Sequence, residues 1–288
     1  MNAPTTETLG AEAEAFARKM KIPPCPEIAA KVMEESRAED PDFRKIGAFI
    51  TKDLTLSATI LRTVNSPFYG LRQPVDSIQQ ALTMLGLKTV SNLVVGLLLR
   101  QAFPNLKSPG MRRFWDLSSK QAAISTFLAN ETRTVSRELA YTFALFNHCG
   151  MPVLRTQHAD YETHLAGTSD TRGRELLELE SNQFGVTHAQ LGFLLARGWF
   201  MPVPTCQAIL NGVAYPKADE LRAEAIDPSM QLAAIATVAD WIIDRLEQVE
   251  RTVETADWAF ALQQLNLDDT KAADLAKQAP EVLASASV

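Results

Sequence analysis

The sequence has few cysteines and lacks the common nucleotide and phosphate motifs. Its 288 residues include Cys25, Cys149 and Cys206, which lie far apart and form no Cys-x-x-Cys pair. This spacing excludes a disulfide framework and the usual zinc sites, and it favours free thiols in a reducing compartment. There is no P-loop, no Gly-x-Gly-x-x-Gly fingerprint and no Gly-x-Ser-x-Gly elbow. We therefore expect no cofactor.

Long hydrophobic runs and an excess of basic residues are also absent. The longest apolar run, 93–99, is about a third of a membrane span, and the first 14 residues are polar and acidic. We therefore expect a cytoplasmic protein with no membrane partner. The 28 basic and 34 acidic side chains give a net charge of −6, which argues against nucleic acid as a partner.

What the sequence does contain is helical periodicity along its whole length. Apolar residues recur at helical spacing and make up 46% of the chain with Cys and Tyr included, so the sequence predicts an all-α multi-helix bundle. The helix over 87–103 is apolar over too wide a surface to face solvent, and we expect it at the centre. Gly150 is expected to close the helix that starts after Ser136. Capping residues mark the predicted helix starts: Asp53, Asp76 with Gln79, Ser136, Thr187 with Gln190, and Asp227 before Pro228.

The best internal boundary is the turn-rich stretch Pro-Asn-Leu-Lys-Ser-Pro-Gly at 104–110. It predicts a helical subdomain over residues 21–104 and a second helical subdomain over 110–250. A polar helix over 1–20 precedes them, and a helical tail over 251–288 follows.

Three ordered stretches in the first part of the chain resemble the HDOD domain, a relative of the HD phosphohydrolases. They are Ile22-Pro-Pro-Cys-Pro-Glu-Ile28, then Lys52-Asp53-Leu54 leading into Leu61-Arg-Thr-Val-Asn-Ser-Pro-Phe-Tyr-Gly70, and Ile78 through Leu85-Gly-Leu-Lys88. The resemblance continues more weakly to about residue 246. It implies a module of bacterial signal transduction, of a kind often linked to cyclic-di-GMP pathways, motility or stress responses. Because the sequence shows no receiver, GGDEF or EAL segment, we expect the module to stand alone.

The resemblance also implies that the HD metal site is degenerate. Leu117 stands where the HD hydrolases would supply a histidine, and Asn147-His148 stands where they have His-Asp. Asp240 and His188 match expected ligands, whereas Leu210 and Asn211 replace a histidine pair. Because leucine cannot bind a metal and the Asn carbonyl binds weakly, we expect no metal and no hydrolysis. The relic HD pocket is a candidate ligand site with these residues: Leu117, Asn147, His148, His188, Asn211 and Asp240.

The leading interpretation is a non-catalytic regulatory module that binds a signalling protein or a small ligand. Two alternatives remain open, namely a divergent HD-type metal-dependent phosphohydrolase and a nucleic-acid-associated regulator. The candidate partner contacts lie on expected irregular segments and comprise Asn65, Tyr69, Arg72 and Trp199. Asn65 could instead simply end its helix, and Trp199 could instead plug the core.

Overall fold

The described part of the chain is built from helices. The structure, a computed structural model, describes residues 19–66, 69–103, 109–161, 163, 173–211, 227–249 and 255–286, and none of these forms a strand. The prediction of an all-α fold is confirmed. Residues 1–18, Pro67 and Phe68, and most of the predicted boundary at 104–110 lie outside the described residues. Within the described ranges, none of the helices combines the length and the apolar character that crossing a bilayer needs.

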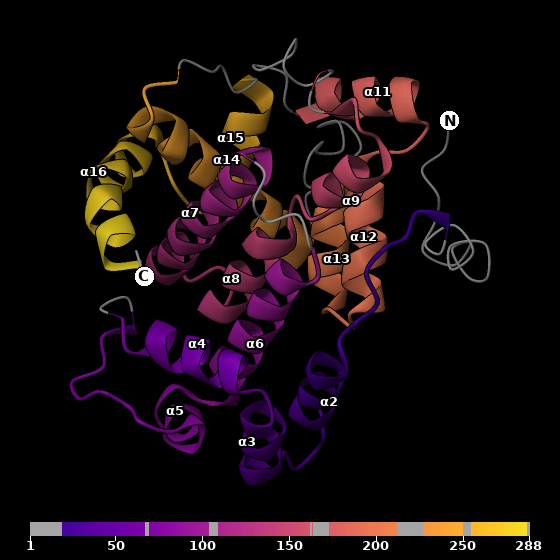
Figure 1. Cartoon of the computed structure of the whole chain (residues 1–288). Helices are drawn as coiled ribbons and strands as arrows, with labels where there is room; N and C mark the ends of the chain where they lie inside the picture. Colours follow the sequence, from indigo (N-terminus) through magenta and orange to yellow (C-terminus); the bar gives the residue numbers. More distant parts are fainter. Residues whose placement is uncertain are drawn as a thin grey trace.

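Five helices form the N-terminal part of the molecule, shown in indigo to purple in Figure 1. They are α2 (Glu27–Ser36), α3 (Phe43–Thr51), α4 (Leu54–Val64), α5 (Ile78–Leu85) and α6 (Leu87–Gln101). The Asp53 carboxylate caps α4 as predicted, since its Oδ1 accepts from Leu56 N at 2.9 Å. For α5 the prediction was wrong by one residue, because Ser77 caps the helix while Gln80 Oε1 accepts from Asp76 N.

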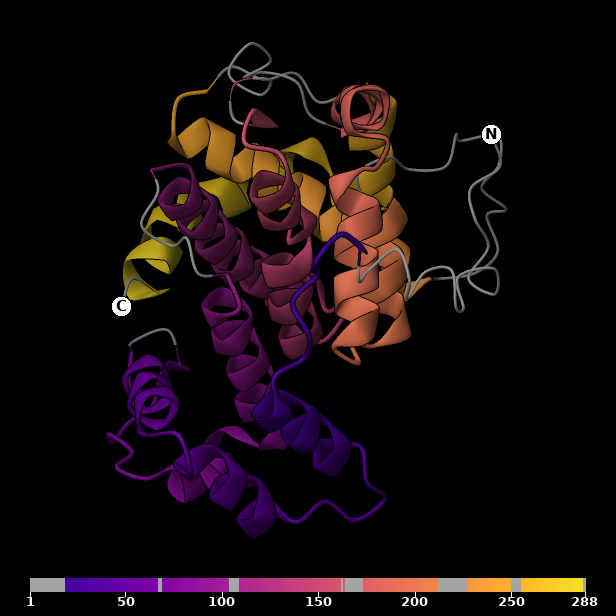
Figure 2. The ribbon, with the colours of Figure 1, turned by 45° about the vertical axis from the view of Figure 1, so that its right-hand side comes forward.

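The remaining helices form a larger bundle above the N-terminal part (Figures 1 and 2). They are α7 (Pro109–Thr132), α8 (Arg137–Phe146), α9 (Gly150–Gln157), α11 (Gly173–Phe184), α12 (His188–Gly198), α13 (Val203–Asn211), α14 (Pro228–Leu246), α15 (Thr255–Gln264) and α16 (Asp269–Ala286). Ser136, Thr187 and Asp227 cap α8, α12 and α14 as predicted. Gly150 does not close α8, which ends at Phe146; it begins α9 instead.

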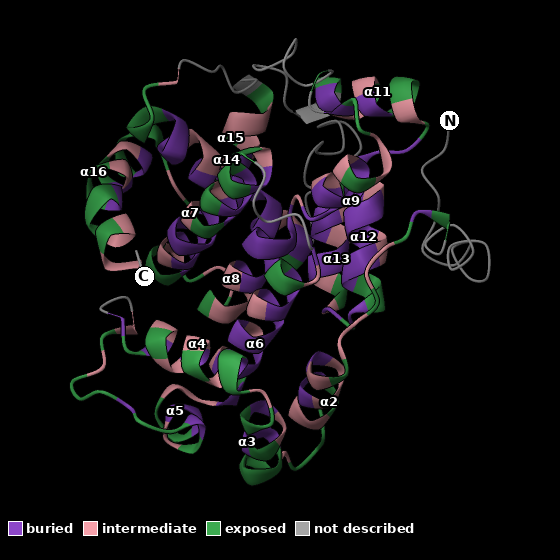
Figure 3. Cartoon of the chain, in the orientation of Figure 1, coloured by how far each residue is buried: buried purple, intermediate pink, exposed green. Residues whose placement is uncertain are grey.

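Helix α6 joins the two groups through one continuous hydrophobic core. It packs on α2, α4 and α5 on one side and on α8 on the other, and most of its residues are buried, as the sequence predicts. Purple, buried stretches accordingly run through both groups in Figure 3. Gly96 allows the contact with α8, because a Cβ at this position would collide with the Leu145 side chain. The core therefore does not stop at the predicted boundary between 21–104 and 110–250.

Trp199 connects the segment before α2 to the larger bundle. Its indole Nε1–H donates to the Pro23 carbonyl at 3.0 Å, and its ring meets Phe146 edge-on with the ring centres 6.0 Å apart. Only 1% of Trp199 is exposed, so in this structure its ring offers no surface to a partner. The neighbouring Phe200 is 52% exposed and has a φ of 57°.

Removing the Trp199 side chain should therefore destabilise the whole fold. We expect Trp199→Ala to lower the free energy of unfolding by about 3–5 kcal/mol, because a large buried ring and its hydrogen bond are lost together. Phe200→Ala is the matched control and should change it by less than about 1 kcal/mol. Denaturant unfolding followed by circular dichroism measures both. Equal stability of the two variants would contradict the core role of Trp199.

Candidate functional site

His188 is completely buried at the first position of α12, where a capping box holds the helix start. The Thr187 hydroxyl accepts from Gln190 N at 3.2 Å, and the Gln190 side chain accepts from Thr187 N at 3.0 Å. This is the predicted reciprocal cap. It fixes the backbone of His188 and turns the imidazole toward α11 and α9, with no exposed surface left.

A buried carboxylate, Glu180 on α11, receives three donors at this point. The Tyr161 hydroxyl donates to Oε1 at 2.7 Å, and the His188 backbone N–H donates to Oε2 at 2.7 Å. His188 Nδ1 lies 2.8 and 2.9 Å from the two carboxylate oxygens. Burial is the largest single influence on the pKa of Glu180 and raises it. The hydrogen bonds and charge of His188, together with the hydrogen bond from Tyr161, outweigh burial and hold the pKa below its ordinary value.

The other side of His188 continues the same hydrogen-bond chain. His188 Nε2 lies 3.3 Å from His148 Nδ1, and His148 Nε2 lies 3.2 Å from Asn147 Nδ2. We call Tyr161, Glu180, His188, His148 and Asn147 the histidine chain. Each of the four ring nitrogens takes part in a hydrogen bond within this chain.

Two glycines, Gly150 and Gly192, allow the close approach of α9 and α12 that brings His148 and His188 together. A Cβ on Gly150 would collide with the His188 carbonyl oxygen and lie 2.7 Å from Gly192 N. A Cβ on Gly192 would lie 3.0 Å from Ile209 and 3.5 Å from Gly150 N. Helices α9 and α12 therefore cross with their backbones almost in contact, which only residues without a side chain allow.

The remaining residues of the relic HD pocket do not belong to the histidine chain. Asp240 on α14 accepts at Oδ1 from Gln121 Nε2 of α7 at 3.2 Å. Leu117 lies one turn before Gln121, partly buried against the core. Asn211 is exposed at the end of α13. The structure thus joins Asn147, His148 and His188 by hydrogen bonds.

The HD-type metal does not fit these residues. Leu117 offers a hydrocarbon, and every ring nitrogen of both imidazoles is already hydrogen-bonded within the histidine chain. Across the described ranges, no three His, Cys, Asp or Glu side chains come together as a group that could hold an ion. A metal would have to break the histidine chain to obtain its ligands.

The candidate partner contacts on the segment after α4 have distinct places. The Asn65 side chain forms two hydrogen bonds with the backbone of Val75, donating to its carbonyl and accepting from its N–H, each at 2.8 Å. These bonds close the loop that carries Tyr69 and Arg72. Arg72 is exposed, whereas Tyr69 is half-buried and lines a cavity. Asn65 therefore positions the loop.

The sequence reasoning missed Glu180 and Tyr161. Nothing in the pattern of α11 marks Glu180, because the helix is rich in exposed Glu and only the fold brings this one against His188. The one local signal is the spacing Glu180 to His188 across Gly185, whose φ of 72° lets the chain reverse between α11 and α12.

The comparisons with known proteins identify the family of the chain. The sequence matches the family model described as the HDOD domain over residues 22–214, which is well over half of the chain. The chain belongs to the HDOD family. The HDOD match covers α2 to α13 and so includes the histidine chain and the Asn65 loop.

The curated relatives match over part of their length. An uncharacterized protein of Treponema pallidum is 24% identical over 204 residues, which is 69% of this chain and 40% of that protein. The uncharacterized protein YuxH of Bacillus subtilis is 33% identical over 64 residues, 22% of this chain and 16% of YuxH. This HDOD chain thus corresponds to less than half the length of either protein.

Solved structures share the fold. An HDOD domain protein of unknown function from Geobacter sulfurreducens has a TM-score of 0.72 at 20% identity, over 98% of both chains. A protein of Shewanella amazonensis, named as a candidate phosphohydrolase, has a TM-score of 0.71 at 22% identity over 94% of this chain and 95% of that one. A candidate signal transduction protein of Marinobacter aquaeolei has a TM-score of 0.71 at 20% identity, over 94% of this chain and 60% of that one. At these identities the likeness establishes the fold alone.

A methyl group at the helix crossing should be costly. Gly150→Ala places its Cβ against backbone atoms of His188 and Gly192, which cannot rotate away. We expect it to lower the free energy of unfolding by about 2–4 kcal/mol. Gly198→Ala, on the exposed end of α12 with open space around its Cα, should leave it unchanged or raise it by up to about 1 kcal/mol. Thermal unfolding of both variants measures this, and a stable Gly150→Ala would refute the close crossing.

Glu180 should make stability depend on pH. Because the pKa of Glu180 is lower in the folded than in the unfolded chain, its contribution is full above its ordinary value of 4.5 and is lost as the pH falls below it. Glu180→Gln should therefore cost about 2–4 kcal/mol at pH 7 and flatten the loss of stability between pH 5 and 3. Glu178→Gln, exposed on the same helix, is the control and should keep the wild-type profile. A Glu180→Gln profile parallel to wild type would contradict this assignment.

Proposed function

We propose that this HDOD chain is a non-catalytic signal-transduction module that regulates by binding a partner protein or a small ligand. Membership of the HDOD family supports a signalling role at the coarse level. The observation that carries the non-catalytic part is the histidine chain, in which every ring nitrogen of both imidazoles is hydrogen-bonded. A metal hydrolase needs free ligand lone pairs and an open coordination position for water, and this arrangement provides neither from these histidines.

The burial and hydrogen bonding of the histidine chain also support a structural role. Glu180 and His188 are fully buried and mutually hydrogen-bonded, which offsets the cost of removing a carboxylate from water. Rotation of Glu180 or His188 would leave another buried group unpaired, so this part of the cluster resists rearrangement. We infer that it holds α9, α11 and α12 in fixed relation and that regulation acts through the surface they support.

The partner surface that we propose includes the loop closed by Asn65. Tyr69 and Arg72 lie on this loop, and two side-chain hydrogen bonds of Asn65 fix its ends. A loop that is held in place loses little conformational entropy on binding, which favours recognition. We also propose the cytoplasm as its compartment, supported by Cys25, Cys149 and Cys206, which are all free thiols.

Metal content and turnover test the non-catalytic role directly. We expect the chain, purified without chelator and dialysed, to hold well below one Mn, Fe or Zn per molecule by elemental analysis. We expect it to leave cyclic dinucleotides and nitrophenyl phosphodiesters intact even with added Mn²⁺. Stoichiometric metal together with turnover that Asp240→Ala abolishes would overturn the proposal and favour a divergent phosphohydrolase.

A genetic test separates binding from catalysis in the cell that encodes the protein. We expect Asp240→Asn to restore the transcript profile of a deletion strain as fully as wild type, because no reaction depends on this carboxylate. Arg72→Ala, an exposed change that leaves the core intact, should restore it less well if the Asn65 loop contacts the partner. Failure of Asp240→Asn at wild-type protein levels would contradict the non-catalytic role.

A further inference from the structure

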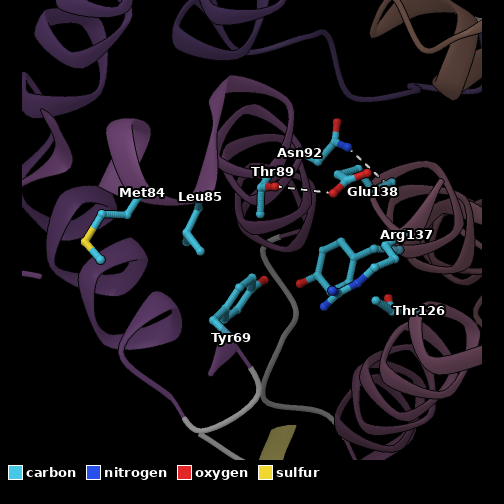
Figure 4. A pocket seen from close by; sticks show the side chains of 9 residues that line it. Tyr69, Met84, Leu85, Thr89, Asn92, Thr126, Arg137 and Glu138 are labelled. Carbon is cyan, nitrogen blue, oxygen red and sulfur yellow. Dashed lines mark hydrogen bonds between the residues drawn. The ribbon is translucent and has the colours of Figure 1, made fainter. Parts of the chain in front are cut away.

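A cavity of about 200 Å³ opens where the N-terminal helices meet α8. We call it the junction cavity, and Figure 4 shows its side chains. The residues that carry the argument are Tyr69, Met84, Leu85, Arg137, Glu138 and Tyr141. They come from the Asn65 loop, from α5 and from α8, so the cavity is built by both groups of helices.

The two phenols of the cavity are neutral hydrogen-bonding groups. Burial raises the pKa of Tyr69 well above its ordinary value, and Tyr141 adds to the rise while Arg137 opposes it. Burial likewise raises the pKa of Tyr141 to about 12. The hydroxyl of Tyr69 therefore lies within electrostatic reach of Tyr141, Arg137 and Glu138. The polar ends of four side chains converge on one side of the cavity.

Two opposite charges line the cavity, and of these Arg137 is exposed and Glu138 is half-buried. Within the described residues, Arg137 makes no side-chain hydrogen bond and no ion pair, and Glu138 accepts only one long bond, from Thr89 Oγ1 at 3.5 Å. Arg137 also opens α8, where the helix dipole disfavours a cation. An anion bound at Arg137 would relieve this mismatch and gain from the same dipole.

The opposite end of the cavity is apolar. Figure 4 places Met84 and Leu85 across the cavity from Arg137 and Glu138. Met84 is 48% exposed, so its flexible thioether side chain is accessible at this end. The cavity thus offers an anion site, a cation site and an apolar wall within a small volume.

We propose that the junction cavity binds a free α-amino acid with an apolar side chain. The Arg137 guanidinium binds the carboxylate, the Glu138 carboxylate binds the ammonium, and Met84 and Leu85 contact the side chain. A ligand of one charge sign would meet its like charge at Arg137 or Glu138, whereas a zwitterion satisfies both. The volume is below the 300–1,000 Å³ typical of sites for drug-sized ligands, which favours a small metabolite.

A ligand series on the unchanged protein tests this chemistry. Isothermal titration calorimetry would use L-leucine, L-methionine and L-phenylalanine, with N-acetyl-leucine lacking the ammonium and leucinamide lacking the carboxylate. We expect saturable binding of at least one of the three amino acids, and at least tenfold weaker binding of each derivative that loses a charge. Adenine and guanine, which present donors and acceptors without charge, are the competing class.

Variants then assign the contacts. Arg137→Gln and Glu138→Gln should each weaken amino-acid binding tenfold or more, and Arg100→Gln, exposed at the end of α6 and outside the cavity, should not. Thermal unfolding of each variant without ligand controls for folding. The ligand series needs no variant, so the test stands even if one of them does not fold.

Several outcomes would overturn the proposal. No saturable binding of any of the three amino acids up to 10 mM would do so, and so would equal binding of N-acetyl-leucine or preferential binding of a nucleobase. Binding that survives both Arg137→Gln and Glu138→Gln would place the ligand elsewhere. None of these results bears on metal content or turnover, so the non-catalytic function stands or falls separately.

Discussion

The close crossing of α9 and α12 is the constraint on which the site depends. At Gly150 the backbone of α9 lies against the carbonyl of His188, nearer than any side chain would permit. This approach carries His148, two residues before Gly150, to within 3.3 Å of the His188 ring. A larger residue at Gly150 would separate the helices and break the bond between the two imidazoles. The geometry of the histidine chain is therefore decided by a residue that has no side chain.

In a metal hydrolase a bound cation holds the buried histidines in place. In this protein the negatively charged carboxylate of Glu180 has that role. Glu180 pairs with Nδ1 of His188, and Nε2 of His188 pairs with Nδ1 of His148. Nε2 of His148 in turn lies beside the Asn147 amide. Every ring nitrogen is thus used within the protein, and none is left to bind a metal.

The sequence predicts local structure well because helix caps are local. Asp53 and Thr187 act on residues three positions away, and both caps are found as expected. Adjacent capping residues create the one-residue error at Ser77, since Asp76 and Ser77 both have a residue of the right type at the right spacing. Trp199 is different, because its hydrogen-bond partner is Pro23, 176 positions earlier. No pattern near Trp199 distinguishes a core residue from a contact residue.

The same limit applies to the site. Asn147, His148 and His188 could be selected from family resemblance, but Glu180 and Tyr161 acquire their roles only through tertiary contact. For the residues of the Asn65 loop, the sequence identifies the residues but not their roles. Asn65 and Tyr69 stand out in the sequence, yet the Asn65 bonds to Val75 show that its task is to hold the loop. A pattern can identify a residue that matters before it identifies what that residue does.

Helix α8 connects the two polar regions of the molecule. Arg137 and Glu138 lie at its first turn, and Asn147 and His148 follow its last, so the two regions lie toward opposite ends of a helix of 10 residues, about 15 Å long. Between them, the Leu145 side chain packs directly against Gly96 of α6. One helix thus places side chains in the junction cavity at its first turns and leads into the histidine chain at its end. Its packing on α6 fixes where both sets of polar groups lie, because closely packed interfaces resist gradual deformation.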